Sequence, residues 1–291
     1  YGVMLLWDVI LLYQYFPQGE KGAFLFLRWV DQFLPLAFTG LFINIGLFAH
    51  LVIMWVGPLQ VQVQGLFVGA PYHDVPALVA FLTILVTTVN FVVSVEVNFY
   101  PKYKNYYSLF NDKGAVGDIT QAGEEMLKVL NVELKYTALK QLLATALAVS
   151  LGGLLLEYVP LGFNDLMEGY FRTLCVGYGI YAVANTILLL LLYFTDYKGA
   201  LAASGCFAGG TVLFTVISLF FPRVYYGFGF LAGSAVFFLI AAFRLDYYTK
   251  RLPYYILSVQ PVVAREKRGT FSRLGFFLSK KLERSQNSEK I

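Results

Sequence analysis

The chain carries a succession of apolar runs, each about twenty residues long, separated by shorter segments that contain turn residues and charges. A helix of about twenty apolar residues is long enough to cross the hydrocarbon core of a bilayer. Of the 291 residues, 58% are hydrophobic and 14% are charged, and no segment between the runs has the length of a separate water-soluble domain. The sequence therefore predicts an all-α polytopic membrane protein.

The apolar runs predict about seven transmembrane helices, at residues 1–16, 33–56, 77–100, 138–158, 170–194, 201–221 and 225–245. Because the first run starts at Tyr1 without the basic start and cleavage site of a signal peptide, we interpret the chain as a fragment of a longer protein. The predicted organisation has three parts: a truncated helix with an inner interfacial segment (1–32), a six-helix lobe with a cytoplasmic amphipathic insert at 101–137 (33–252), and a basic cytoplasmic tail (253–291).

The distribution of basic residues orients these spans. If the carboxyl-terminal tail is cytoplasmic, all but two of the 22 Lys and Arg residues lie on the inner side, the exceptions being Arg172 and Arg223. Residues 265–291 hold eight basic and three acidic side chains, so the basic balance belongs to the tail. We expect this tail to contact anionic lipid at the cytoplasmic surface, either as a basic amphipathic helix or as a disordered segment, and we expect no nucleic-acid partner.

One predicted span, within residues 78–107, carries a narrow polar stripe. At about 100° per residue, five polar side chains fall within roughly 80° of one another: Thr83, Thr87, Asn90, Ser94 and Asn98. Such groups are costly in hydrocarbon without a partner, so they line a substrate path or bond to a neighbouring helix, and both interpretations stay open. Asn44, in the preceding span, is a further candidate for the path, although a single amide in a span more commonly packs.

Two histidines are present. His50 lies deep in the second span, where it is either a buried histidine with satisfied hydrogen bonds or a proton or cation relay. His73 lies with Tyr72 and Asp74 in the segment 68–76, which we predict to be an outer loop. These side chains either contact sugar or are ordinary polar residues of a loop without a binding role.

Charged residues near the inner ends of the spans have two interpretations each. Glu96 points almost opposite the polar stripe, so we expect an ion pair with an inner-surface base such as Lys102, with a coupling carboxylate as the alternative. Asp196 and Lys198 lie in a short inner turn and are expected to form a solvated charge pair, with a gate latch as the alternative. The insert at 101–137 is predicted to turn at 114–117 and then form an amphipathic helix, which either lies along the inner interface before it rises into the next span or is a solvated linker helix.

No pattern typical of an enzyme is present: there is no carboxylate pair at a pocket mouth and no glycine-rich phosphate loop. Cys175 and Cys206 lack the spacing of a metal site or a disulfide framework and are expected to pack. We therefore predict no catalytic residue, metal or cofactor. The spacings Gly205-xxx-Gly209 and Gly229-xxx-Gly233 indicate close helix packing.

The order of several segments resembles a known family. FTGLFINIGLFAHLVIMW (38–55), APYHDVPALVAFLTI (70–84), VEVNFYPKYKNYYSLF (95–110) and LLYFTDYKGALAAS (191–204) are similar to the PelG family. That family is the integral-membrane component of Pel-type exopolysaccharide export, within the multidrug/oligosaccharidyl-lipid/polysaccharide (MOP) flippase superfamily. The resemblance covers nearly all of residues 36–250.

The resemblance implies a transporter of two helical lobes, of which this chain would supply the second lobe and the last helix of the first. It implies outward movement of a growing or lipid-linked polysaccharide across the bacterial inner membrane by alternating access. It also implies a cytosolic glycosyltransferase and other membrane subunits of a synthase as partners. One departure is that the family's Trp-x-Asp-Lys is replaced here by Phe48, Ala49, His50 and Leu51, so no charge pair is carried over to that position.

Two other functions fit the same sequence. A cation-coupled drug or small-molecule antiporter of the same superfamily should show a buried carboxylate in its spans. A non-transporting scaffold for a glycosyltransferase would need no polar path. Polysaccharide export instead requires a path lined by amides, hydroxyls and aromatic rings, and the polar stripe favours it.

Overall fold

The computed structural model of the chain describes residues 2–15, 24, 26–65, 67–111, 114–158, 162–259 and 269–288. Two compact units are present, one formed by Phe38–Val259 and the other by Tyr1–Ala37 with Gln260–Ile291. Tyr1, Phe16 and the charged residues 265–268 of the predicted tail lie outside the described residues. The two units are taken in turn below.

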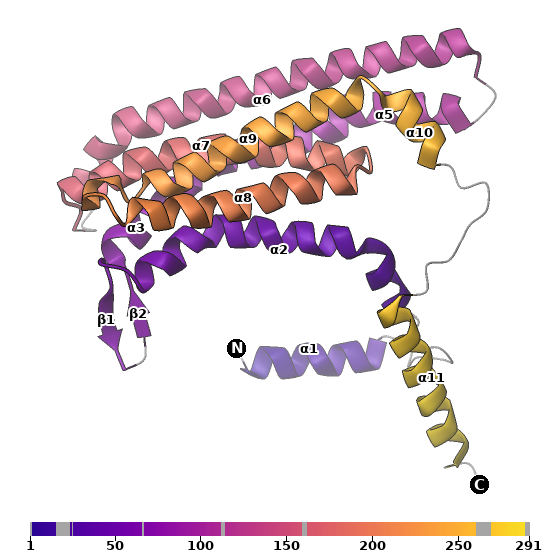
Figure 1. Cartoon of the computed structure of the whole chain (residues 1–291), viewed down its shortest axis with the longest axis horizontal. Helices are drawn as coiled ribbons and strands as arrows, with labels where there is room; N and C mark the ends of the chain where they lie inside the picture. The colour runs from indigo at the N-terminus through magenta and orange to yellow at the C-terminus, as the bar shows by residue number, and fades with distance from the viewer. Residues whose placement is uncertain are drawn as a thin grey trace. The chain divides into compact units, whose positions relative to one another are not determined.

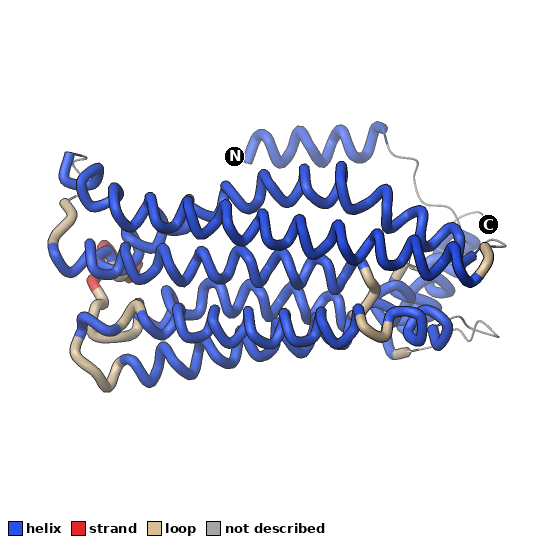
Figure 2. Tube along the Cα trace, turned by 90° about the horizontal axis from the view of Figure 1, so that it is seen from above, coloured by secondary structure: helices blue, strands red, loops and turns tan. Residues whose placement is uncertain are grey.

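The larger unit is a bundle of long helices, with a small β-hairpin at one end (Figures 1 and 2). Its elements in order are α2 (Leu27–Trp55, from Phe38 onward), β1 (Val61–Gln64), β2 (Phe67–Gly69), α3 (Pro71–Phe81), the 3₁₀ turn η1 (Leu82–Ile84), α4 (Leu85–Val92), the π-helix η2 (Val93–Phe99), α5 (Tyr100–Asn111), α6 (Val116–Tyr158), α7 (Asp165–Tyr193), α8 (Tyr197–Ser218), η3 (Arg223–Tyr225), α9 (Phe228–Thr249) and α10 (Leu252–Val259). We call the end that carries β1 and β2 the hairpin end and the opposite end, which carries α10, the α10 end.

Helix α7 is the centre of this bundle. It packs against α3, α4, α6, α8 and α9, and most of its side chains are buried. A helix that is apolar around its whole circumference needs neighbours on all sides, which explains why the run at 170–194 lies inside. The strongest pairing joins α8 to α9, where a Cβ on Gly233 would lie 2.8 Å from the Cα of Thr211. The Gly229/Gly233 spacing therefore brings two backbones together, as predicted, whereas Gly209 has open space beside it.

The described residues confirm an all-α polytopic membrane fold. Five helical stretches are long and apolar enough to cross a membrane: Leu27–Trp55, Pro71–Phe110, Asp165–Tyr193, Tyr197–Ser218 and Arg223–Thr249. The predicted count of seven is not confirmed. The first run gives only a shorter apolar stretch, Val3–Leu12, and the run at 138–158 forms part of the longer helix α6.

Two connections differ from the sequence expectation. The segment after α2 forms the antiparallel hairpin β1–β2, in which Gly65 takes a positive φ of 58° that glycine adopts without steric cost. The segment at 101–137 forms a helical hairpin of α5 and α6, with its turn near Gly114 as predicted. Helix α6 runs unbroken for 43 residues, so its amphipathic start is continuous with the span and is not a separate interfacial helix.

The smaller unit contains α1 (Gly2–Tyr15), the start of α2 and α11 (Thr270–Ser288). Within it, the Asp31 carboxylate accepts hydrogen bonds from the backbone nitrogen and hydroxyl of Ser272, each at 2.7 Å, and so caps the first turn of α11. Helix α2 leaves helical geometry at Phe33, two residues before Pro35. A proline removes a backbone donor and restricts the residue before it, which accounts for the kink.

Candidate functional site

The predicted polar stripe lies against α6. Thr87 donates to the side-chain oxygen of Gln141 at 2.5 Å, Asn90 donates to the Thr137 hydroxyl at 2.7 Å, and Asn98 donates to the Glu133 carboxylate at 2.8 Å. We call the whole set the α4–α6 polar row; it comprises Thr83, Thr87, Asn90, Ser94 and Asn98 on one side and Glu133, Thr137, Lys140, Gln141 and Thr145 on α6. Three members of the stripe therefore bond to a neighbouring helix, which is one of the two interpretations that the sequence left open.

One edge of the polar row, formed by Asn90, Asn98, Glu133 and Lys140, is not fully buried, and we call it the rim. Thr87, Ser94, Thr137 and Gln141 are buried, whereas Asn98 and Lys140 are exposed and Asn90 is half-buried. Lys140 donates to the side-chain oxygen of Asn90, and no carboxylate among the described residues pairs with it. Lys140 lies in the apolar stretch 138–158 and Asn90 in the candidate span Pro71–Phe110, so the ammonium group is held between two largely apolar segments.

The backbone beside this rim is irregular. Residues Val93–Phe99 form a π-helix, and Ser94 and Asn98 of the polar row belong to it. A π-helical turn is wider than an α-turn and shifts every following side chain around the helix axis, and such segments occur often at functional sites. The shift helps Asn98 to reach Glu133 while Ser94 stays buried and accepts from Asn90 at 3.2 Å.

A small cavity lies on the other side of α4, where it faces α7. Its volume is about 100 Å³, and polar side chains contribute to its lining, namely Thr87, Thr88, Asn185 and Thr186. Asn44, the remaining candidate for the path, is exposed and turns back to donate to the carbonyl of Gly40 on its own helix at 2.8 Å. No described contact joins Asn44 to the polar row.

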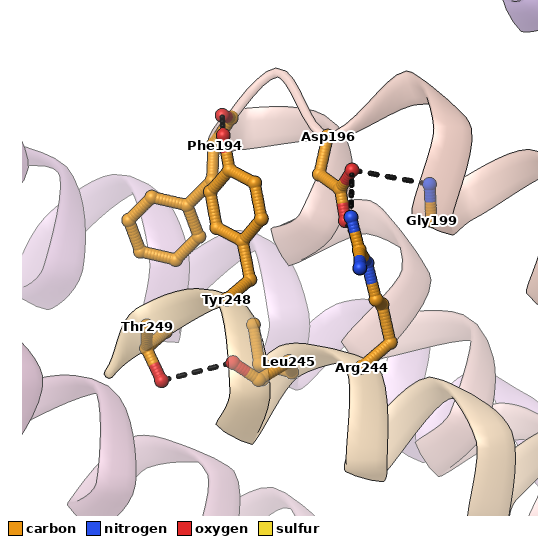
Figure 3. Close-up of polar contacts among 7 residues, drawn as sticks. All are labelled: Phe194, Asp196, Gly199, Arg244, Leu245, Tyr248 and Thr249. Atoms are coloured by element: carbon orange, nitrogen blue, oxygen red, sulfur yellow. Dashed lines mark hydrogen bonds and ion pairs between the residues drawn. The ribbon is translucent and has the colours of Figure 1, made fainter. Parts of the chain in front are cut away.

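At the α10 end, a buried ion pair joins the turn between α7 and α8 to α9 (Figure 3). The Asp196 carboxylate accepts from the Nε and Nη2 atoms of Arg244 at 2.6 and 2.8 Å and caps α8 by accepting from the backbone nitrogen of Gly199 at 3.1 Å. Its side chain is 5% exposed. The expected solvated pair with Lys198 is therefore wrong, because Asp196 faces inward and Lys198 is exposed.

The predicted ion pair between Glu96 and Lys102, also at the α10 end, is wrong as well. The glutamate carboxylate accepts from the phenol of Tyr193 at 2.8 Å, whereas Lys102, the expected partner, pairs with Glu125 of α6 at 2.9 Å. The hydrogen bond from Lys102 lowers the pKa of the Glu125 carboxyl. Two more tyrosines bind the carboxyl-terminal end of α7: the phenol of Tyr103 donates to the carbonyl of Tyr193, and the phenol of Tyr248 donates to the carbonyl of Phe194.

At the hairpin end, the two histidines meet. His73 lies in the first turn of α3 and not in a loop, because β2 ends at Gly69 and Pro71 starts the helix. His50 and His73 are both fully buried, and their ring centroids lie 5.1 Å apart. The sequence interpretation placed His73 on the surface and so missed this pair.

Comparison with known proteins decides the family. The profile of the PelG family, described as "Putative exopolysaccharide Exporter (EPS-E)", matches residues 1–257. The chain belongs to the PelG family. No curated protein and no solved structure matches it significantly. Family membership and the apolar helices together make the chain a multi-pass membrane protein of an exopolysaccharide exporter family.

Within this PelG chain, sequence reasoning found one side of the polar row and missed the other. Glu133, Lys140 and Gln141 escaped notice because α6 was divided into an amphipathic helix and an apolar span, with the divide falling between them. The signal that could have found Lys140 was its charge inside an apolar run. Arg244 was hidden because a single basic residue at the end of a span is the ordinary pattern of a cytoplasmic boundary.

Proposed function

We propose that this chain moves polysaccharide, or a lipid-linked glycan, outward across the bacterial inner membrane by a flippase-like alternating-access mechanism, as part of Pel-type export. Its carboxyl terminus lies in the cytoplasm, where the basic residues gather. Family membership supports the export of exopolysaccharide. The observation that carries the mechanism is the open rim of the α4–α6 polar row.

The rim offers the chemistry that a glycan path needs. Amides, a carboxylate and an ammonium group lie in succession at Asn90, Lys140, Asn98 and Glu133. Each can exchange its present partner for a sugar hydroxyl, because hydroxyl groups both donate and accept. Exposed groups of this kind within an apolar lobe must face water or protein and not lipid. We therefore assign the path lining to the rim, with buried Thr87 and Ser94 and half-buried Thr83 as its support.

The test compares the rim with its support. In cells that depend on this chain for export, Lys140→Leu should lower secreted polysaccharide at least about ten-fold, because it removes a charge-assisted contact with the moving glycan. Lys140→Arg should retain most secretion. The control is Thr87→Val, which breaks a buried bond to Gln141 away from the rim and should lower thermal stability with little effect on secretion.

Secretion is normalised to the amount of protein in the membrane and to recovery of the complex. Wild-type secretion by Lys140→Leu would refute the path. Lost secretion with an intact complex would count against a scaffold that transports nothing. The antiporter alternative is weakened because the buried carboxylate among the described residues, Asp196, is paired with the guanidinium of Arg244 through two hydrogen bonds.

The partners we propose are a cytosolic glycosyltransferase and other membrane subunits of the synthase. The hairpin of α5 and α6 is the surface that we offer to the glycosyltransferase. A groove of about 460 Å³ lies there, lined by apolar residues of both helices and of α10, such as Tyr106, Ile119, Leu127 and Leu252. Recovery of an intact complex after deletion of residues 114–123 would remove this surface from the proposal.

Helix α11 is the surface that we offer to anionic lipid. Basic Arg273 and Lys280 lie on it together with exposed Phe271, Leu274 and Phe277, the composition of a helix that lies on a membrane surface. Flotation with vesicles that contain phosphatidylglycerol should fall when both basic residues are changed to glutamine, and unchanged flotation would contradict this assignment.

A further inference from the structure

The chain has only two histidines, and the fold brings them into contact. His50 comes from α2 and His73 from the first turn of α3, at the hairpin end of the bundle. Their rings meet edge to face with centroids 5.1 Å apart, and neither side chain is exposed. Two imidazoles at this distance influence each other's charge, since both cannot become cationic without strong repulsion.

Aromatic rings from two other helices enclose the pair. Phe230 of α9 lies 4.5 Å from His50, and Tyr170 of α7 lies 5.5 Å from His73, measured between ring centroids. The phenol oxygen of Tyr178, also on α7, lies 3.3 Å from Nε2 of His50. The phenol of Tyr170 is already used, because it donates to the backbone carbonyl of Arg223.

His73 has hydrogen-bonding capacity that is not used in this structure. Neither of its ring nitrogens has a hydrogen-bond partner among the described residues. A neutral imidazole carries one N–H donor and one bare acceptor nitrogen, so in either tautomer His73 buries both without a partner. Burial of unpaired polar groups is costly, and natural proteins keep such groups mostly where a ligand, a water or a change of state uses them.

The charged and titratable groups around the pair are few. Helix α7 contributes Tyr170 and Tyr178, and α9 presents Phe230, which has no charge. Helix α3 contributes Asp74, whose Oδ2 accepts from the indole of Trp55 and the backbone of Ala70, while its Oδ1 is buried without a partner. A carboxylate oxygen with unused capacity therefore lies one residue from His73.

We propose that His50 and His73 form a single buried proton-binding site, and that proton uptake requires the hairpin ends of α2 and α3 to separate from α7 and α9. In the closed bundle an imidazolium would lie among rings without an ion pair, so the charged state needs water or a rearranged Asp74. Proton binding thereby favours an open hairpin end. This coupling rests on the alternating access proposed above, but its test measures protons and not export, so the two can fail separately.

The test is a pH titration by NMR of the whole chain in lipid nanodiscs with ¹³C-labelled histidine and ¹⁵N-labelled tryptophan, where the two histidine ring signals report on this site alone. We expect both signals to move in the same pH interval with the uptake of one proton, and the indole signal of Trp55 to move with them. His73→Phe should shift the titration midpoint of His50 by at least about 0.5 pH units, since it removes the neighbouring charge. Tyr72→Phe, an exposed neighbour of His73, is the matched control and should leave both midpoints unchanged.

Three results would overturn the proposal. The first is that neither ring signal moves between pH 8 and the pH at which the chain unfolds. The second is that the two rings titrate independently, with midpoints unaffected by removal of the other ring. The third is that both rings titrate while the Trp55 indole signal, which reports on the hairpin end, stays constant, because protonation would then need no opening. The first and third results come from the unaltered chain, so they do not depend on whether a variant folds.

Discussion

Removal of the Asp196 carboxylate should destabilise the bundle more than removal of any exposed carboxylate on the same helices. Asp196→Ala deletes two charge-assisted hydrogen bonds from Arg244 and the cap of α8, and it leaves a guanidinium that is 29% exposed without its partner. Breaking a buried ion pair by removing one partner costs about 3–5 kcal/mol, and losing a helix cap costs about 1 kcal/mol. Because Arg244 can still reach water, we expect a total near the lower end, about 3 kcal/mol.

A double-mutant cycle isolates the pair. Arg244→Met keeps most of the apolar stem of the side chain and removes its charge, and the double variant removes both charges. The double variant should be less destabilised than the sum of the single variants, with a coupling energy of about 2 kcal/mol. Unfolding is followed in mixed detergent micelles by circular dichroism, with each variant measured over the same denaturant range.

The structure supplies a matched control on α9. Asp246 and Lys250 form an ion pair at 2.7 Å, one helical turn apart, with side chains 60% and 71% exposed. An exposed pair of this kind contributes little, so Asp246→Ala should cost less than about 0.5 kcal/mol. The reasoning is refuted if Asp196→Ala costs no more than Asp246→Ala, or if the coupling with Arg244 is below about 0.5 kcal/mol.

Further predictions concern packing, the backbone and pH. Gly233→Ala should cost about 1–3 kcal/mol because its Cβ would lie 2.8 Å from the Cα of Thr211, whereas Gly209→Ala, with nothing within 4 Å, should not lower stability in the same thermal denaturation assay. Thr195→Gly should raise stability by about 1 kcal/mol, because a branched residue is held at a φ of 61°, and an unchanged melting temperature would contradict this. The contact between α5 and α6 should be pH-dependent. Because the bond from Lys102 lowers the pKa of Glu125, its contribution is present above the ordinary value of 4.5 and is lost as pH falls through the lowered value. Because both side chains are 45% exposed, the effect should be small: the stability of the bundle in denaturant titrations should fall only slightly on acidification through this range, and Glu125→Gln should abolish that pH dependence.

The sequence alone predicted much of the fold, because crossing a bilayer requires apolar runs of fixed length that can be counted without a structure. It also found the stripe from Thr83 to Asn98, since helical periodicity fixes which residues share a face. It failed at the first turn of α3, where Pro71 resembles a loop residue but starts the helix that buries His73. Composition and short-range patterns do not distinguish a proline in a loop from a proline that starts a helix.

Partner choice was decided only by the tertiary structure. Periodicity states that Asn90 shares a face with Thr87, but it cannot state that this face meets Thr137, Lys140 and Gln141 of α6. The same holds for Asp196, which pairs with Arg244, 48 residues further along the chain, and does not pair with the nearby Lys198. Ion pairs and hydrogen bonds depend on distances between elements, and those distances are set by how α7, α8 and α9 pack. The sequence thus determined which polar groups had to be hidden, and the packing of helices determined what each of them is hidden against.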